Sequence, residues 1–221
     1  MIDLHTHTVF SDGSLIPAEL ARRAKVAGYL GLAFTDHADQ SNLQWILERV
    51  MPAVQDLSSA VGLQLTAGIE LTHVPPEQIA KLVHQARMMG AFPVLVHGQT
   101  LVEPVCPGTN LAAIQAGADI LAHPGLITAD EVRLAAENNV VLELSTRQGH
   151  SLSNGHVAEL ASKAGCKLVI SNDAHEPSDL VHAELRKNIA LGCGLNDSQY
   201  QQTEENARQI LKTATKLRKQ Q

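Results

Sequence analysis

The chain has 221 residues, 44% of them hydrophobic and 3% aromatic, which predicts a single domain, residues 1–221, with an aliphatic core. A formal net charge of −6 argues against strong electrostatic binding of nucleic acid, and no apolar run of about 18 residues is present to span a membrane. Three scattered cysteines without a CxxC pair exclude a disulfide framework and predict reduced thiols in a cytoplasmic protein.

Short apolar runs alternate with amphipathic segments along the chain. Each run has the length of a buried strand and is nearly continuous in apolar residues, as parallel strands covered on both faces are. The seven runs are residues 2–5, 30–35, 63–69, 92–97, 119–123, 140–144 and 167–171. Helical periodicity marks the segments between them. The predicted helices are residues 18–27, 42–60, 75–89, 110–115, 129–138, 157–164, 178–191 and 197–217.

Seven strand-then-helix units in one domain predict an α/β fold with parallel strands. We expect a distorted seven-stranded (β/α)7 TIM-like barrel, because regular alternation of strands and helices builds a parallel sheet with helices outside it. A doubly wound open sheet is the alternative.

Histidines and carboxylates stand at the ends of the predicted strands. Parallel strands point their carboxyl ends at one mouth, so side chains far apart in the sequence are expected to converge there. A single histidine at a strand end is more often a polar residue with its hydrogen bonds made than a metal ligand. Burying six histidines together would cost much free energy unless bound cations compensated for it. The residues are His5, His7, Asp36, His37, Glu70, His97, His123, Asp173 and His175.

Two pairs of these residues share one spacing. Residues i and i+2 of a strand point the same way, so His5 and His7 can reach one ion, and Asp173 and His175 repeat the arrangement. A mixed set of nitrogen and oxygen donors without cysteine suits Zn, Mn or Fe. The sequence therefore predicts a cofactor of two or three divalent metal ions.

The combined pattern resembles the PHP (polymerase and histidinol phosphatase) superfamily over residues 3 to about 175. The resemblance implies a distorted seven-stranded β/α barrel, a trinuclear metal site and hydrolysis of phosphomonoesters or phosphodiesters. Some members are domains attached to DNA polymerases. The matching motifs are Asp3-Leu4-His5-Thr6-His7, Thr35-Asp36-His37, Gly68-Ile69-Glu70, His97, Ala122-His123-Pro124 and Asn172-Asp173-Ala174-His175.

The resemblance also implies how nine residues divide into three metal sites that share one bridging carboxylate. The first site would consist of His5, His7, Glu70 and Asp173. The second would consist of the bridging Glu70 with His97 and His123. The third would consist of Asp12, His37 and His175.

Asp12 departs from the commonest pattern of the family, in which many members have histidine at this position. Aspartate also occurs there, and it favours harder ions. The alternative interpretation is a turn residue beside Gly13.

Catalysis by such a site needs no protein nucleophile. Bound divalent ions lower the pKa of water toward about 7 and neutralise charge on the phosphate. Glu70 counts among the catalytic residues as the bridging ligand. Asp36 or Asp173 could accept a proton from the attacking water, and the sequence does not choose between them.

Residues beyond the strand ends are candidates for holding the substrate. Arg147 follows the sixth strand, and its guanidinium suits the outer oxygens of a phosphate. His150 shares that loop and could contact the substrate or protonate a leaving group. Residues 99–109 form a candidate lid.

Two further ionisable residues have no assigned role. Glu143 lies near the end of the sixth strand, where it faces either the mouth or a partner inside the barrel. His73 follows Glu70 closely, and we expect it on the surface.

Three functions fit these observations. The leading hypothesis is a small-molecule phosphomonoesterase similar to histidinol-phosphate phosphatases, which the acidic balance of the chain favours. The second is a phosphodiesterase or 3′-exonuclease acting on nucleotides or nucleic-acid ends. The third is a non-catalytic metal-binding module, against which the complete ligand set argues.

Overall fold

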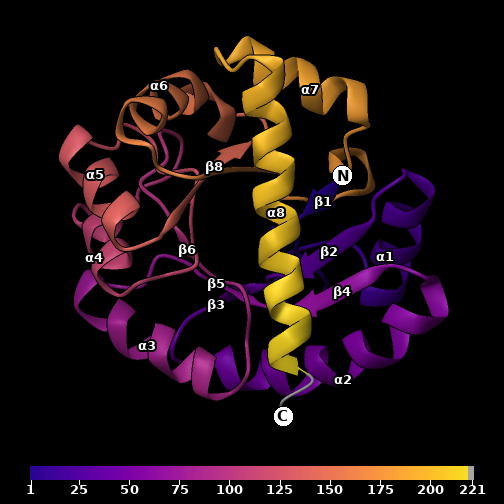
Figure 1. Cartoon of the computed structure of the whole chain (residues 1–221). Coiled ribbons are helices and arrows are strands. Elements are labelled where there is room, and N and C mark those ends of the chain that lie inside the picture. The colour runs from indigo at the N-terminus through magenta and orange to yellow at the C-terminus, as the bar shows by residue number, and fades with distance from the viewer. Residues whose placement is uncertain (219–221) are drawn as a thin grey trace.

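The computed structural model describes residues 1–218, which form short parallel strands surrounded by helices (Figure 1). The strands are β1 (Ile2–Asp3), β2 (Gly31–Phe34), β3 (His37–Ala38), β4 (Gln64–Ala67), β5 (Ile69–Leu71), β6 (Val94–His97), β7 (Ile120–Ala122), β8 (Val141–Ser145) and β9 (Leu168–Ser171). The α-helices are α1 (Pro17–Val26), α2 (Leu43–Val61), α3 (Pro76–Met88), α4 (Thr109–Gln115), α5 (Ala129–Glu137), α6 (Asn154–Ala164), α7 (Ala183–Gly192) and α8 (Asp197–Arg218). Two 3₁₀ helices are η1 (His150–Ser153) and η2 (Pro177–Asp179).

All strand pairs are parallel and follow the chain around a ring. One sheet has the order β1-β2-β4 and the other has the order β3-β5-β6-β7-β8-β9. The third expected strand is split at Gly68 into β4 and β5, and β3 is an additional two-residue strand just beyond the second expected strand, which ends at residue 35. The parallel α/β fold predicted from the sequence is confirmed, with one interruption and one additional strand that the apolar runs do not mark.

The first and last strands meet through a few specific contacts. Thr6 and Ala174 form an isolated parallel bridge, and His7 N donates to Ala174 O over 2.9 Å. Closer to the strand starts, the carboxylate of Asp3 accepts a hydrogen bond from Asn172 N over 3.0 Å. Arg186 from α7 donates to the carbonyl oxygens of Ile2 and Ile170. We call the place where β1 and β9 meet the seam. Side chains replace part of the backbone hydrogen-bond ladder there.

Helix α8 lies across the ring at the end where the strands begin (Figure 1). Its side chains Ala207 and Leu211 join a small core made by residues of β1, β2, β6, β7, β8 and β9. Gly31 permits this approach, because a Cβ there would lie 2.1 Å from Leu211 Cδ2. A larger core fills the space between the strands and the outer helices. With the strand starts covered by α8, the open mouth of the ring lies at the carboxyl ends.

The predicted helices are present, with one correction. The segment expected as a helix over residues 178–191 forms η2 and then α7, so its first five residues are not part of an α-helix. His182 explains the late start: its Nδ1 accepts a hydrogen bond from Leu185 N over 3.2 Å and caps the helix. Within residues 1–218, none of the helices has the length and apolar composition that crossing a membrane requires.

Candidate metal centre

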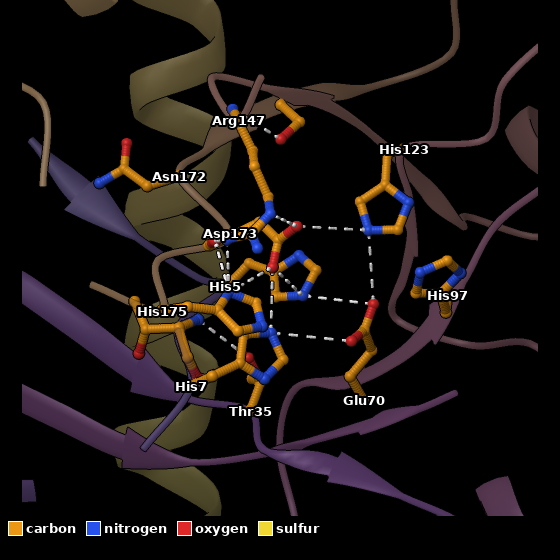
Figure 2. Close-up of polar contacts among 12 residues, drawn as sticks. His5, His7, Thr35, Glu70, His97, His123, Arg147, Asn172, Asp173 and His175 are labelled. Carbon is orange, nitrogen blue, oxygen red and sulfur yellow. Dashed lines mark hydrogen bonds and ion pairs between the residues drawn. The ribbon is translucent and has the colours of Figure 1, made fainter. Parts of the chain in front are cut away.

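Side chains from separate strand ends converge at the mouth of the ring (Figure 2). Glu70 lies within β5, His97 ends β6, and the other members follow β1, β7 and β9 directly. Figure 2 shows the side chains of His5, His7, Glu70 and Asp173 directed toward one another, with His123 beside them. All five are at least 97% buried. The structure thus brings together residues that are up to 168 positions apart in the chain.

Glu70 lies at the centre of this cluster. Its Oε1 is 3.2 Å from His5 Nε2 and 3.6 Å from His123 Nε2. Its Oε2 is 2.7 Å from His37 Nδ1 and 3.7 Å from His7 Nε2. Burial opposes ionisation, but the charges of His5 and His37 outweigh it and hold the pKa of Glu70 well below its usual range. A carboxylate with histidines on both oxygens is placed to bridge two ions.

The other donors around His5 and His7 have the spacing of ligands to a shared ion. His7 Nε2 is 3.1 Å from Asp173 Oδ1, and His5 Nε2 is 3.6 Å from the same oxygen. Two ligands of one tetrahedral zinc ion lie about 3.4 Å apart when each bond is about 2.1 Å. The ring of His7 is neutral at pH 7, because burial and the neighbouring His37 lower its pKa to about 3. Its nitrogen lone pair is therefore free for a cation.

A second convergence involves the loop after β1. Asp12 Oδ1 is 3.1 Å from His175 Nε2 and 3.4 Å from His37 Nε2, and the two ring nitrogens are 3.4 Å apart. Gly13 holds the loop close, because a Cβ there would lie 2.3 Å from His7 O. Together with His7, which also belongs to the first cluster, these three residues form a group whose donor atoms lie within 4.8 Å of one another and that fits one ion.

The third convergence brings together His97, His123 and His150, whose donor atoms lie within 4.8 Å of one another. The rings of His123 and His150 are stacked with their centroids 4.1 Å apart. His97 Nδ1 lies 3.1 Å from Gly98 O and donates to this carbonyl oxygen. The sequence assigned His97 and His123 to a metal, and His150 stands beside them.

Unpartnered polar atoms test whether a cation fits this cluster. Buried donors and acceptors normally have hydrogen-bond partners, and leaving one without costs about 1–3 kcal/mol. Among the described residues, five such atoms of the cluster have none: His5 Nε2, His7 Nε2, Glu70 Oε1, His123 Nδ1 and His123 Nε2. Three of them face one another, because His5 Nε2 and His123 Nε2 lie 3.2 and 3.6 Å from Glu70 Oε1. Divalent cations satisfy these lone pairs, so the residues fit a metal cluster.

Two of the converging residues have strained backbones. His123 has φ 27° and Asp173 has φ 53°, in the left-handed region that costs a non-glycine residue about 1–3 kcal/mol. Both residues follow a strand, where the chain turns out of the sheet. Strain of this kind is typical of functional sites, where the surrounding structure enforces an exact side-chain direction.

Glu143 supports the cluster from inside the ring. Its Oε1 is 2.8 Å from His5 Nδ1, and its Oε2 accepts a hydrogen bond from His123 N over 3.1 Å. Of the two orientations open from the sequence, the structure shows the one toward a partner inside the barrel. A carboxylate on Nδ1 fixes the ring so that Nε2 faces the metal position, the usual arrangement around metal-bound histidine.

We expect Glu143→Gln to weaken metal binding about 10- to 100-fold, the range found for lost partners of metal ligands. An amide has one acceptor and one donor, so it cannot accept from both His5 Nδ1 and His123 N. The measurement is metal affinity by competition with a chromophoric chelator. Glu137→Gln, at an exposed position in α5, is the matched control. Equal affinities for both variants would contradict the supporting role of Glu143.

Asp36 lies beside the cluster with its carboxylate turned toward the loop after β1. It accepts hydrogen bonds from Thr8 N over 2.7 Å and Ser11 Oγ over 2.8 Å. Burial raises its pKa. These contacts hold the loop that carries Asp12. Asp173, which faces His5 and His7, is the better placed of the two carboxylates for accepting a proton.

Arg147 and His150 both line the mouth, a cavity of about 250 Å³. Arg147 Nη1 donates to Asp173 O over 3.0 Å and lies 2.7 Å from His175 Nδ1, so the guanidinium borders the second convergence. His150 Nδ1 is 2.7 Å from Thr100 Oγ1, and its Nε2 is 3.6 Å from Asp173 Oδ2. Burial, together with His123, lowers the pKa of His150 to about 4, so this ring is neutral.

Two residues that the sequence did not place at the site also line this cavity. Glu103, in the loop between β6 and α4, lies 3.1 Å from His97 Nε2. The hydrogen bond with His97 is the main cause that lowers the pKa of Glu103 to about 2. His73, expected on the surface, lies at the rim with its Nε2 3.1 Å from the same carboxylate. The one signal in the sequence was that Glu103 falls within the candidate lid.

Comparisons with known proteins agree with this geometry. The PHP domain family model matches residues 3–217. The chain is 44% identical over 203 residues to the uncharacterized protein MJ1295 of Methanocaldococcus jannaschii, covering 91% of this chain and 93% of the relative. It is 29% identical over 203 residues to a probable phosphatase of Shewanella pealeana, covering 79% and 77%. Ribonuclease P protein component 3 of Methanosarcina mazei is 27% identical over 213 residues, covering 89% and 82%.

Solved structures share the fold at low sequence identity. A protein of Listeria monocytogenes, provisionally named the histidinol phosphatase hisK, matches with a TM-score of 0.59 at 12% identity, covering 83% of this chain and 98% of that one. A Xaa-Pro dipeptidase matches with a TM-score of 0.63 at 13% identity, covering 97% and 75%. The family match spans nearly the whole chain and includes all the converging strand ends. The chain therefore belongs to the PHP domain family.

Proposed function

We propose that the protein is a phosphomonoesterase that acts on a small phosphorylated molecule with two or three divalent ions, Zn, Mn or Fe. The observation that carries the proposal is the convergence of buried nitrogen and oxygen donors, several without hydrogen-bond partners, around the carboxylate of Glu70. Ions bound there would polarise a phosphate and activate water.

The shape of the mouth supports a small substrate. The cavity beside the cluster measures about 250 Å³, below the usual range of about 300–1,000 Å³ for ligand pockets. Arg147 is the one basic side chain other than histidine among the residues that line it. A long nucleic-acid strand would need an extended row of cations along its backbone.

The residues at the mouth would have three roles: metal binding, acceptance of a proton and contact with the substrate. His5, His7, Asp12, His37, Glu70, His97, His123, Asp173 and His175 would hold the ions. Asp173, whose carboxylate faces His5 and His7 at the centre of the cluster, would accept a proton from the attacking water. Arg147 and His150 would contact the outer phosphate oxygens, since both line the cavity.

A phosphate-release screen tests the proposal. The panel contains sugar, amino-alcohol and nucleotide monophosphates together with phosphodiesters, and each of Zn, Mn and Fe is supplied in turn. We expect strong turnover of at least one small monoester. No turnover of any ester with fully loaded metal would contradict the proposal.

The second candidate is a phosphodiesterase acting on nucleotides or RNA ends. The observation that favours it is the 27% identity to ribonuclease P protein component 3. In the same screen, hydrolysis of diesters or shortening of an oligonucleotide without monoester turnover would select this function.

A prediction for Arg147 separates recognition from metal binding. A monoester dianion offers more charge to a guanidinium than a diester does, so Arg147→Ala should impair monoester hydrolysis more. One lost charge-assisted hydrogen bond is worth about 1.5–3 kcal/mol, which is about 10- to 150-fold in kcat/KM. The measurement compares kcat/KM for one monoester and one diester, with bound metal quantified.

Two outcomes would overturn the recognition role of Arg147. Equal small effects on both substrates would place it outside the contact with phosphate. Loss of metal would instead make it a support of the ligands Asp173 and His175, which it contacts in the structure.

A further inference from the structure

A carboxylate from an irregular loop enters the mouth from outside the metal-ligand set. Glu103 lies in residues 98–108, between β6 and α4. Its Oε2 is 3.1 Å from both His73 Nε2 and His97 Nε2, and its Oε1 is 3.4 Å from His150 Nε2. The three rings come from different strand ends, those of β5, β6 and β8. Together they surround one anionic group.

Two of these rings are not needed by the metal cluster. His73 and His150 are not among the nine candidate metal ligands. Each of them contacts Glu103 at the mouth. Thr100 Oγ1 lies 2.7 Å from His150 Nδ1; when this hydroxyl donates to Nδ1, the proton of the neutral ring is on Nε2, toward Glu103. Imidazole N–H groups are ordinary donors to anionic oxygens. Their arrangement is that of an anion site.

The loop that carries Glu103 is well anchored at its base and exposed beyond it. At the base, the side chains of Gln99 and Asn110 bond to each other's backbone N–H groups. Beyond it, the side chains of Leu101 and Val102 are about half exposed. Residues 101–108 form side-chain hydrogen bonds and ion pairs across the mouth. Within residues 1–218, all of these contacts come from Glu103.

We propose that His73 and His150, beside the metal ligand His97, form an anion subsite for a phosphate group, and that Glu103 is its internal occupant, displaced when phosphate binds. A carboxylate and a phosphate both present anionic oxygens to the same donors, but phosphate carries more charge and more oxygens. Arg147 lines the same cavity and adds a cation that suits phosphate. The choice of phosphate as the ligand rests on the proposed function.

This arrangement would make Glu103 a determinant of specificity. A ligand enters the subsite only if it outcompetes the carboxylate, so a monoester dianion has an advantage over a singly charged diester. Removing the charge of Glu103 should therefore improve diester binding more than monoester binding. The loop would also be released whenever phosphate occupies the subsite.

The test is binding of inorganic phosphate to the metal-loaded full chain, measured by calorimetry, with metal content determined for every variant. Glu103→Gln should bind phosphate about 10-fold more tightly or better, because the competing charge-assisted contact is worth about 1.5–3 kcal/mol. Glu137→Gln removes an equal charge at an exposed site and should leave phosphate affinity unchanged. In the Glu103→Gln background, His73→Ala should weaken phosphate binding about 3- to 10-fold.

Hydrogen exchange of residues 101–108 gives an independent reading. In the wild type, phosphate should speed exchange in this segment, whereas in Glu103→Gln exchange should already be fast and insensitive to phosphate. Unchanged or weaker phosphate binding in Glu103→Gln would overturn the proposal. Loss of metal from that variant would also overturn it, because Glu103 would then be a ligand rather than a competitor. These measurements need no turnover, so they are separate from the substrate screen.

Discussion

Glu70→Gln is expected to lower turnover at least ~100-fold, the scale of effects seen when metal binding is disturbed. The carboxylate lies within 3.7 Å of His5, His7, His37 and His123, and both of its oxygens take part. Glutamine keeps the size of the side chain but removes the charge, so one group can no longer join two cations. The measurement is kcat/KM on the best substrate of the screen, together with metal content.

Two comparisons make the Glu70 result specific. The fold should survive, because the mouth of a barrel contributes to function more than to stability, so the unfolding transition should stay close to that of the wild type. Glu137→Gln, at its exposed position, should retain full activity. Unchanged turnover and metal content in Glu70→Gln would show that this carboxylate does not bridge.

The second large effect concerns stability at the opposite end of the ring. Arg186 is fully buried; its Nε donates to Glu204 Oε1 over 2.7 Å, and its Nη2 donates to the carbonyl oxygens of Ile2 and Ile170. Arg186→Met should lower the free energy of unfolding by about 3–5 kcal/mol, because it removes the buried charge partner of Glu204 and the donor to two carbonyl groups near the seam. Chemical denaturation measures the loss.

Two further variants test the reason for that loss. Arg23→Met removes an exposed arginine paired with Glu19 one helical turn away, and it should cost about 0.3–0.5 kcal/mol. Arg186→Met combined with Glu204→Met should recover part of the stability, because the Glu204 charge is removed together with its buried partner. A loss below about 1 kcal/mol in Arg186→Met would contradict the buried-pair explanation.

The sequence was most informative where one local pattern determined the structure. Apolar runs of strand length predicted the parallel strands, and polar residues at their ends predicted the convergence at the mouth, because parallel strands open to one side. The split in the third strand and the separate strand β3 were not predictable in this way. Thr35, which lies between β2 and β3, accepts a hydrogen bond from Thr6 N at its Oγ1 over 3.1 Å, a contact that a hydrophobicity pattern does not reveal.

Contacts between distant or irregular segments were beyond the sequence. Glu143 contacts His5, which lies 138 positions away in the chain, so its orientation depends on how β8 and β1 are placed relative to each other. Glu103 reaches the mouth from a loop without regular structure, where no periodicity predicts the direction of a side chain. Arg186 looked like an ordinary helical arginine, because its burial depends on how α7 packs beside β1 and β9.

Elemental analysis of freshly purified protein tests the central claim most directly. The converging donors predict at least two transition-metal ions per chain, with activity lost on chelation and restored when Zn, Mn or Fe is returned. Less than one ion per chain, with none taken up on incubation, would contradict the metal cluster and the hydrolase that depends on it.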